Sequence, residues 1–354
     1  MSPSPVVHFA GPDYPRGHLR DLLEERVDAV PAGGAIDWVT YYFRDRRLAE
    51  ALVRARRRGV AVGVAVDGRP RTSHANDEVA ATLEAALGAE LRRVLHPGVR
   101  LPGRPVRHPH LHEKLYCFSH PRPTAFVGSF NPSGDGIDDD PEMLEEIRDQ
   151  DAGHNLLVEL AAPAVAEALA AHAREIRSMH HGLLERFSPR RQRSVTAPNL
   201  RIDFWPRAFR NPVLVLLRGV APGASVRIAA SHLKGGTMHR ALARLARHGT
   251  SVTILTEETR RRVPDAVFRA LSALSVSIER VRHPDGFPMH DKFMLIESGS
   301  ERVVVFGSFN WTERSFRLNH EISVVCRDPS VFAAFSDRWK ALAELSGGSV
   351  VAAV

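Results

Sequence analysis

The sequence predicts an α/β fold made of two similar halves, each a sheet flanked by helices. Three observations support this prediction. Short β-branched runs alternate with helical patterns along the 354 residues, as they do in α/β proteins. The order of these patterns is the same in both halves. The tripeptide His-x-Lys also occurs twice, at 112–114 and 290–292, and the two copies are 178 residues apart, about half of the chain.

The predicted strands follow one order in each half. In the first half the strand candidates are 6–9, 35–43, 60–68, 112–118, 124–131 and 154–160. In the second half they are 200–204, 225–231, 250–258, 290–296, 302–310 and 320–326. Because helical segments separate several of these runs, we expect mostly parallel strands within each sheet.

Two segments with helical apolar periodicity occur in each half. They span 47–59 and 162–176 in the first half, and 238–249 and 328–342 in the second. The earlier helix of each half ends at a glycine, Gly59 or Gly249, which is a common stop signal. The later helix begins next to Pro163 or Pro329, and proline is frequent at the first helical position.

A polar, basic segment at 188–198 contains prolines near both ends and predicts a boundary between the halves. We therefore expect an N-terminal domain over 1–190 and a C-terminal domain over 198–354. Two insertions lengthen the first half. A Pro-, Arg- and His-rich stretch at 69–108 is expected to be a loop, and an acidic stretch at 135–151 is expected to be either a solvated loop or a lid near a site.

The composition limits the class of protein. The chain is 44% hydrophobic and 25% charged, which is typical of globular proteins. It has no apolar run long enough to span a membrane and no secretory signal, so we expect a cytoplasmic protein without an integral membrane segment. The net charge of +7 permits an anionic partner. Cys117 and Cys326 are too few for a disulfide framework and are expected to be buried.

The two His-x-Lys tripeptides predict a site for an anionic substrate. If the tripeptides begin strands, His112 and Lys114 project to one face, because alternate residues of a strand do so. The same holds for His290 and Lys292. The chain has only four lysines, and two of them stand in these tripeptides. An ammonium group neutralises phosphate oxygens, and an imidazole can attack or move protons near neutral pH.

Each tripeptide is followed by the sequence Gly-Ser-Phe-Asn, at 128–131 and 307–310. The glycine permits a tight turn and a close approach of the backbone. The serine and asparagine side chains can donate hydrogen bonds to phosphate oxygens. We therefore expect four substrate-binding residues here, which are Ser129, Asn131, Ser308 and Asn310.

With these doubled motifs the chain resembles the phospholipase D superfamily, whose motif is His-x-Lys-x4-Asp followed by Gly-Ser-x-Asn. The resemblance implies two duplicated phospholipase D-like domains, each a mixed sheet flanked by helices, in a pseudo-twofold arrangement. It also implies that both motif copies form one site that cleaves phosphodiesters without a metal ion or cofactor. One histidine would become a phospho-histidine, the other would protonate the leaving oxygen and then activate water or an alcohol, and the lysines and asparagines would hold phosphoryl oxygens. The motif aspartate is replaced by Ser119 and Glu297. Because that aspartate is mainly structural in the family, we keep the catalytic interpretation.

The resemblance also implies a carboxylate, shortly after Gly-Ser-x-Asn, that orients the catalytic histidine of the other half. Glu321 fits this position, and Asn155, which we expect to bind substrate as well, stands at the matching place of the first half. A nucleophilic histidine gains most from a carboxylate, which holds its tautomer and stabilises its developing positive charge. We therefore predict that Glu321 supports His112, the nucleophile. His290, near Asn155, is then the general acid and base.

Two further patterns carry weaker predictions. Three histidines alternate in "HPHLH" at 108–112, and three imidazoles can bind zinc. No additional ligand completes that pattern, so we expect no metal there and expect His110 to line the pocket or its loop. The aromatic residues Trp38, Tyr41 and Tyr42, at the end of a predicted strand, are expected in the core.

The sequence therefore predicts a phospholipase D-like phosphodiesterase or phosphatidyl-type transferase that acts on a phospholipid or another small phosphodiester. The acidic stretch at 135–151 argues against a general nuclease, whose entrance should be basic. A metal-independent endonuclease stays an alternative because of the positive net charge. A non-catalytic phosphate-binding scaffold is an alternative from another class, since both motif aspartates are replaced. With both motifs in one chain, we expect a monomer that acts as an internal pseudo-dimer.

Overall fold

The computed structural model describes residues 3–100, 106–132, 134, 141, 145, 152–182, 185–188, 191–207, 209–283 and 285–346. The acidic stretch at 135–151 lies outside the described residues except at positions 141 and 145, so its role stays a prediction. Among the helices in the described ranges, none is both long and apolar enough to cross a bilayer.

The first half forms a seven-stranded sheet in the order β1-β7-β6-β5-β2-β3-β4. Its strands are β1 (Val6–Ala10), β2 (Ala35–Thr40), β3 (Ala61–Asp67), β4 (Leu91–Val94), β5 (Leu115–Phe118), β6 (Thr124–Gly128) and β7 (Asn155–Leu160). Strands β2, β3 and β4 pair in parallel, and the other neighbouring pairs are antiparallel. The expectation of mostly parallel strands is therefore wrong, because the short connection from β5 to β6 can join only antiparallel neighbours.

The second half forms an eight-stranded sheet in the order β12-β11-β10-β13-β14-β15-β9-β8. Its strands are β8 (Val195–Ala197), β9 (Leu200–Trp205), β10 (Ser225–Ala230), β11 (Ser251–Glu257), β12 (Ser277–Val281), β13 (Lys292–Ser298), β14 (Glu301–Gly307) and β15 (Glu321–Cys326). Apart from β8, this order repeats that of the first sheet. The repeat confirms the predicted fold class of two duplicated mixed sheets.

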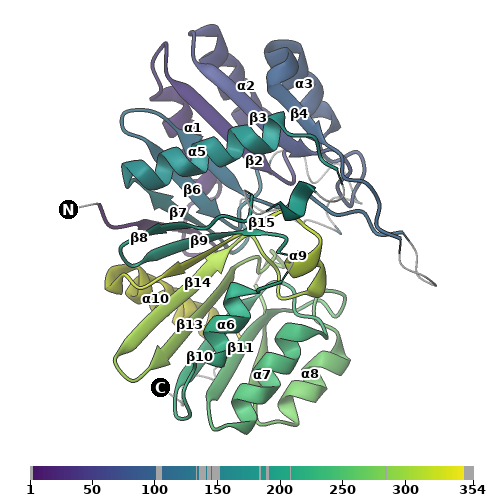
Figure 1. The fold of residues 1–354 in the computed structure, drawn as a ribbon, viewed down its shortest axis with the longest axis vertical. Coiled ribbons are helices and arrows are strands. Elements are labelled where there is room, and N and C mark those ends of the chain that lie inside the picture. The colour runs from purple at the N-terminus through teal and green to yellow at the C-terminus, as the bar shows by residue number, and fades with distance from the viewer. Residues whose placement is uncertain are drawn as a thin grey trace.

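Helices cover both faces of each sheet (Figure 1). One face of the first sheet packs against α1 (His18–Asp28), α2 (Arg46–Arg57) and α3 (Asp77–Leu87). The equivalent face of the second sheet packs against α6 (Pro212–Arg218), α7 (Thr237–Arg247) and α8 (Asp265–Ser272). The opposite faces carry α5 (Pro163–Ser178) and α10 (Pro329–Glu344). The described ranges also contain the short helix α9 (Glu313–Arg317) and the 3-10 turns η1 (Gly88–Glu90) and η3 (Glu185–Phe187).

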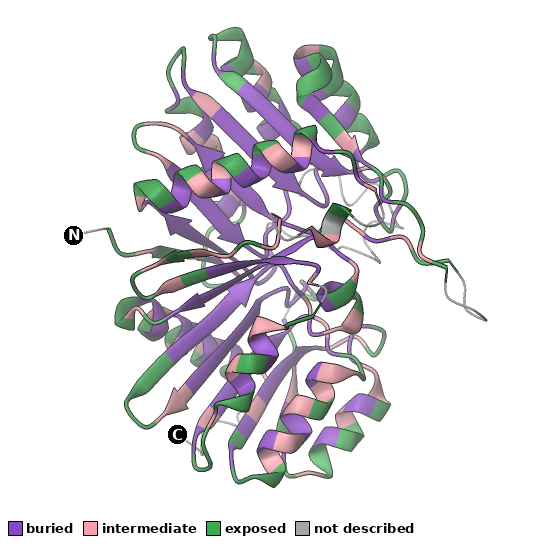
Figure 2. Cartoon of the chain, viewed as in Figure 1, coloured by how far each residue is buried: buried purple, intermediate pink, exposed green. Residues whose placement is uncertain are grey.

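One cluster of buried residues joins the two halves. It includes Leu115 of the first sheet, Phe293 of the second sheet and Trp339 of α10. The strands are buried along most of their length, while the helices expose their outer faces (Figure 2). Cys117 and Cys326 are buried free thiols, as predicted. Because a close-packed interior resists small displacements, this shared core fixes the starts of β5 and β13 relative to each other.

The helix ends follow the predicted signals. Gly59 and Gly249 come shortly after the ends of α2 and α7, with φ angles of 89° and 79°, and this left-handed conformation costs glycine little. The domain boundary proposed at 188–198 stays a prediction. Strand β8 starts within it and pairs with β9.

Candidate active site

The two motif histidines lie just before β5 and β13. They were expected to lie inside these strands. The segment around each histidine is held by the other half of the chain. The backbone N–H of His112 donates to the carbonyl of His320 at 2.9 Å, and the N–H of His290 donates to the carbonyl of His154 at 2.9 Å. The two half-sites are therefore fixed to each other by reciprocal backbone hydrogen bonds.

The side chains of the histidines also cross between the halves. His112 Nδ1 lies 2.8 Å from Glu321 Oε2, and His290 Nδ1 lies 2.9 Å from Asn155 Oδ1. Since carboxylate and carbonyl oxygens accept hydrogen bonds, both Nδ1 atoms are the donors. Nε2 of each neutral ring then carries the free lone pair, which is the arrangement that a nucleophile or a proton acceptor needs.

The two motif lysines are buried completely and sit behind their own histidines. Lys114 Nζ donates to the carbonyl of His112 at 2.8 Å, and Lys292 Nζ donates to the carbonyl of His290 at 2.8 Å. Burial lowers the pKa of Lys114 to about 7. Burial and then the charge of Lys114 lower the pKa of Lys292 well below its usual value. The charge of Lys114 thus acts on Lys292 across the site.

Positive charge and burial also keep the imidazoles neutral. Burial, followed by Lys114 and Lys292, lowers the pKa of His112 well below its usual value. Burial, followed by Lys292 and Arg262, does the same for the pKa of His290. Without a bound anion, both rings are therefore neutral at pH 7, and a neutral imidazole is the form that can attack phosphorus.

The serines of the two Gly-Ser-Phe-Asn segments do not line the cleft, so their expected role in substrate binding is corrected. Ser308 Oγ donates to Glu321 Oε2 at 2.6 Å and accepts from Ile322 N at 3.0 Å. Ser129 Oγ donates to Asn155 Oδ1 at 3.1 Å in the same way. Each serine therefore positions the group that holds a motif histidine. The carboxylate of Glu321 is fully buried, and burial raises its pKa to about 7 against the opposing charge of Lys114.

The glycines of these segments allow this close approach. A Cβ atom on Gly128 would lie 2.1 Å from the carbonyl oxygen of Leu156, and one on Gly307 would lie 2.2 Å from that of Ile322. No side chain tolerates such a contact, so glycine is required where β6 meets β7 and where β14 meets β15.

Both motif histidines and both motif asparagines open onto one cleft of about 670 Å³. Its cationic walls are Arg71, Arg107, Lys234, Arg262 and Arg314. Its remaining lining residues include Tyr41, Tyr42, His110, His232, Glu313 and Asn319. The Oδ1 atom of Asn310 has no hydrogen-bond partner among the described residues. The cleft thus presents two imidazoles, two amides and a strongly positive rim to a ligand.

The expectation that Trp38, Tyr41 and Tyr42 belong to the core is confirmed, since all three are buried and the two tyrosines pack together with Ala75. Trp38 packs against Tyr116 and Phe118. Tyr41 and Tyr42 also line the cleft, because they follow the end of the strand. The Tyr41 ring lies 5.0 Å from the His112 ring, centroid to centroid.

Four buried carboxylates support the motifs and were not predicted. The N–H groups of Leu111 and Met289, which precede the motif histidines, donate to Asp67 and Glu257. The central residues of the two tripeptides are paired with the inner helices, since Glu113 contacts His172 at 2.9 Å and Asp291 contacts Arg338 at 2.8 Å. An acidic residue at the centre of both tripeptides is the sequence signal that indicates this pairing.

The positions of the missing motif aspartates lie at the other end of β5 and β13. Ser119 Oγ accepts from Ala35 N at 2.7 Å. Glu297 accepts from Arg227 at 2.7 Å and lies 3.0 Å from Arg302 Nε. Both residues tie neighbouring strands together and are remote from the cleft lining, which fits a structural role for this position.

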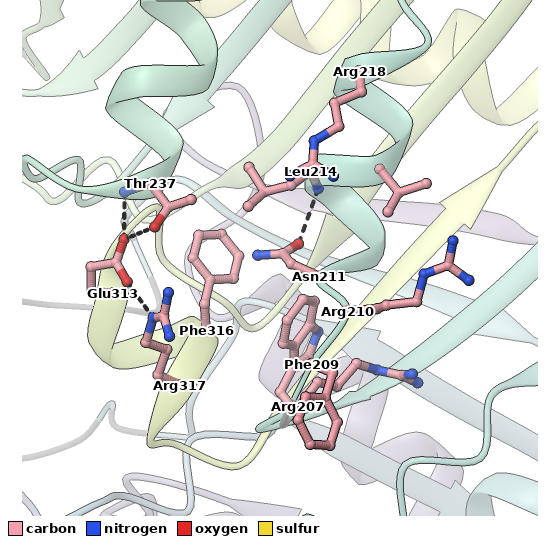
Figure 3. Close-up of a pocket in the computed structure, with 12 residues that line it drawn as sticks. Arg207, Phe209, Arg210, Asn211, Leu214, Arg218, Thr237, Glu313, Phe316 and Arg317 are labelled. Carbon is pink, nitrogen blue, oxygen red and sulfur yellow. Dashed lines mark hydrogen bonds and ion pairs between the residues drawn. The ribbon is translucent and has the colours of Figure 1, made fainter.

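A second hollow of about 340 Å³ adjoins the cleft, and Glu313 lines both (Figure 3). Its basic side chains are Arg207, Arg210, Arg218 and Arg317. Glu313 accepts from Arg317 Nε at 2.7 Å and from Thr237. This hollow extends the positive surface beyond the cleft that holds the motif histidines.

The alternating histidines at 108–112 do not form a metal-binding group in the described part of the chain. His108 Nδ1 lies 2.9 Å from Arg69 Nη1. His110 lines the cleft, as expected, and its Nδ1 lies 3.6 Å from Asp67.

Comparisons with known proteins agree with this architecture. The family described as "Cardiolipin synthase, PLD-like domain" matches residues 31–162 and 221–342. The structure is similar to phosphatidylserine synthase from Haemophilus influenzae, with 13% identity, a TM-score of 0.63, and coverage of 96% of this chain and 86% of that one. It is also similar to polyphosphate kinase from Porphyromonas gingivalis, with 14% identity, a TM-score of 0.60 and coverage of 96% of this chain. The chain spans only half of the kinase. No curated protein matches in sequence.

Proposed function

The chain belongs to the phospholipase D-like family of phosphodiester hydrolases and transferases, and from this membership we propose that it acts through a phospho-histidine formed on His112. One observation carries the proposal. The Nδ1 atoms of His112 and His290 are held by Glu321 and Asn155, each from the other half of the chain, in one basic cleft.

The proposed reaction has two steps. His112 Nε2 attacks phosphorus, a P–N bond forms, and the P–O bond to the leaving group breaks while protonated His290 gives its proton to that oxygen. His290, now neutral, then takes a proton from water or an alcohol. That oxygen attacks phosphorus, the P–N bond breaks, and His112 is released. Glu321 stabilises the positive ring that His112 becomes at phosphorylation.

The positive groups around the cleft suit the charge of this reaction. Lys114 and Lys292 stand beside the histidines and are positive when protonated, and Asn131 and Asn310 offer amide donors. These four residues are proposed to stabilise the phosphoryl oxygens as negative charge develops. A bound phosphodiester anion offsets the charge of the lysines. It thereby raises the imidazole pKa and allows His290 to hold a proton.

For the substrate we propose a phospholipid or another small phosphodiester. The cleft volume of about 670 Å³ falls in the range of small-ligand sites. The matching family is named for an enzyme that makes a phospholipid. Both motifs come from one chain, which supports a monomeric enzyme, and light scattering tests this expectation directly.

A metal-independent endonuclease is the second candidate, and the positive surface favours it. Five cationic residues line the cleft, and four arginines line the adjoining hollow. Such an extended positive surface can contact successive phosphates of a nucleic acid.

The first experiment tests for turnover. Hydrolysis of bis(p-nitrophenyl) phosphate is measured in the presence of EDTA for the wild type, His112→Ala, His290→Ala, and the control His248→Ala, which replaces an exposed histidine after α7. We expect sustained turnover in the wild type and the control only. No turnover of any phosphodiester by the wild type would favour a phosphate-binding scaffold.

The second experiment tests the two histidine roles. The p-nitrophenolate leaving group needs no proton, so His290→Ala should release one burst of product and then stop as the phospho-enzyme. His112→Ala should give no burst. The reverse pattern would exchange the roles of the two residues.

The third experiment separates the substrates. Phospholipid vesicles, single-stranded DNA and duplex DNA are compared for the wild type and for Arg210→Glu and Arg218→Glu. For a phospholipid substrate, the two variants keep their rates on vesicles and neither DNA is cut. DNA cleavage that weakens steeply with salt and with either charge reversal would establish the nuclease.

A further inference from the structure

Three histidines from distant segments meet outside the cleft. His96 follows β4, His181 follows α5, and His320 precedes β15. They are only 7%, 6% and 3% exposed. One ring nitrogen of each lies within 4.8 Å of the others. None of the three lines the cleft that contains His112 and His290, so this cluster is separate from the proposed reaction centre.

Two of these rings have a buried nitrogen with no hydrogen-bond partner among the described residues. His181 Nε2 lies 3.0 Å from the carbonyl oxygen of Ile176, and a carbonyl only accepts, so the proton is on Nε2. The Nδ1 atom of His181 then carries the lone pair, and it has no hydrogen-bond partner in the described ranges. The Nε2 atom of His320 is also buried without a partner among those residues.

The carboxylate of Glu113 lies near Nδ1, the second ring nitrogen of His320. Glu113 Oε1 lies 4.0 Å from His320 Nδ1, and the second oxygen of Glu113 is held by His172 at 2.9 Å. Metal-bound histidines typically direct their second ring nitrogen to a carboxylate or a backbone carbonyl. His320 and His181 have these two kinds of neighbour, respectively.

Stacking alone does not account for the cluster. The His96 and His320 rings stack with centroids 4.7 Å apart, but stacking leaves the buried nitrogen lone pairs without a hydrogen bond, which is unfavourable. The nearby cation Arg191 lies 3.7 Å from both Glu175 and Glu185, so its charge is partly offset. A metal ion would satisfy the lone pairs that the protein leaves open.

We propose that His96, His181 and His320 bind one divalent transition-metal ion, with zinc as the best match, in a site that supports the structure and takes no part in the phosphodiester chemistry. Three imidazole ligands with a water molecule in the fourth position are a known zinc arrangement. Ligand nitrogens around tetrahedral zinc are about 3.4 Å apart, so small ring rotations from the 4.8 Å spacing complete the site.

The proposed ion would brace the contact between the two halves next to His112. His320 N donates to the carbonyl of His110 at 2.8 Å, and its carbonyl accepts from His112 N at 2.9 Å. The next residue is Glu321, which holds the His112 ring. An ion that fixes His320 to His96 and His181 therefore stabilises the contact of His320 with His110 and His112, and it does so without touching substrate.

Metal content tests the site directly. Untagged full-length protein is dialysed with micromolar Zn²⁺ and then without it, and bound metal is measured by mass spectrometry. Co²⁺ is titrated in parallel, and its visible spectrum reports the ligand geometry. We expect about one equivalent in the wild type, and at least about a tenfold loss of affinity in His96→Ala and His181→Ala, with His248→Ala unchanged. A wild type without bound metal, or equal binding by the two variants, would overturn the proposal.

Stability and activity separate this site from the proposed reaction. Zn²⁺ should raise the thermal midpoint of the wild type with a dependence on its concentration, but not that of folded His181→Ala, whose fold is checked by circular dichroism. Chelation should lower the midpoint and leave the initial rate on bis(p-nitrophenyl) phosphate unchanged. Immediate loss of that rate on chelation would contradict a structural role. If the protein turned over no phosphodiester, the metal stoichiometry would still test the site.

Discussion

The Nδ1 atom of His112 lies 2.8 Å from Oε2 of Glu321, although 209 residues separate the two in the chain. The equivalent contact on the other side joins His290 to Asn155 at 2.9 Å. The two half-sites are therefore alike in geometry and differ in charge, because one histidine faces a carboxylate and the other an amide. A carboxylate stabilises a cationic ring far better than an amide does. This difference is the physical basis for giving the two histidines different roles.

Replacing Glu321 tests the support of the nucleophile. In Glu321→Gln the side chain keeps its shape but loses its charge, so the tautomer and the positive ring of His112 are held less well. We expect kcat to fall by about 10² to 10⁴-fold with little change in KM. Steady-state kinetics measure both constants, and the exposed Glu301→Gln serves as the control. A fall in kcat of less than about tenfold would argue against this role of Glu321.

Replacing Asn155 tests the proton donor through pH. Burial and Lys292 hold the pKa of His290 below its usual value, so the protonated donor becomes scarcer as pH rises. On a phosphodiester whose alcohol leaving group needs a proton, we expect kcat/KM of the wild type to decrease with rising pH, by up to about tenfold per unit. In Asn155→Asp the new carboxylate raises the pKa of His290, and the decrease should move upward by about one pH unit or more.

The pH profile needs a control that adds the same charge elsewhere. Asn211 caps α6 by accepting from Leu214 N at 3.0 Å, and aspartate serves equally well at such a position. The profile of Asn211→Asp should match that of the wild type. An unchanged profile in Asn155→Asp would show that His290 is not the group that titrates.

Replacing Lys292 tests whether its buried charge serves catalysis and not the stability of the fold. Because the folded protein lowers the pKa of Lys292 well below that of the unfolded chain, the charged form costs stability at neutral pH. Lys292→Met removes that cost in a similar volume. We expect kcat/KM to fall by about 10² to 10³-fold while the urea midpoint stays equal or rises. The exposed Lys340→Met is the control, and a large loss of stability in Lys292→Met would indicate a structural role.

The sequence was sufficient for the fold class and for the residues that face each other across the site. The doubled His-x-Lys and Gly-Ser-Phe-Asn segments stand at equivalent places of a repeated element order, so their meeting follows from the duplication. The comparison of Glu321 with Asn155 also depends only on matching the two halves. These predictions succeed because each compares a residue of one half with the residue at the equivalent position of the other half.

Other features depend on contacts between elements that no local pattern relates. The stretch 69–108, expected to be a loop, contains α3 and β4. Its apolar positions are diluted by charged residues, and the packing of α3 on β3 and β4 decides its structure. Ser129 and Ser308 were expected to bind substrate. A hydroxyl group can donate a hydrogen bond to a phosphate, a carboxylate or an amide oxygen, and the sequence does not show which of these lies nearby. The positions of β7 and β15 place Asn155 and Glu321 next to the two serines, and the serines therefore donate to these side chains.

The buried pair at the centre of the second tripeptide predicts a loss of stability. Asp291 is fully buried, and Arg338 of α10 donates to it at 2.8 Å. Burial raises the pKa of Asp291 against the opposing charge of Arg338. Arg338→Met leaves this carboxylate without its partner, and we expect a loss of about 3 to 5 kcal/mol in the free energy of unfolding, measured in urea.

Removing the carboxylate as well distinguishes an unpaired charge from a loss of packing. The double variant Asp291→Asn with Arg338→Met has no buried ion at these two positions, so it should recover most of the stability lost in Arg338→Met. The control Arg327→Met breaks an exposed ion pair with Glu301 and should cost at most about 1 kcal/mol. If the double variant is as unstable as Arg338→Met, the arginine stabilises the fold by other contacts, such as the one between its guanidinium and the ring of Phe9.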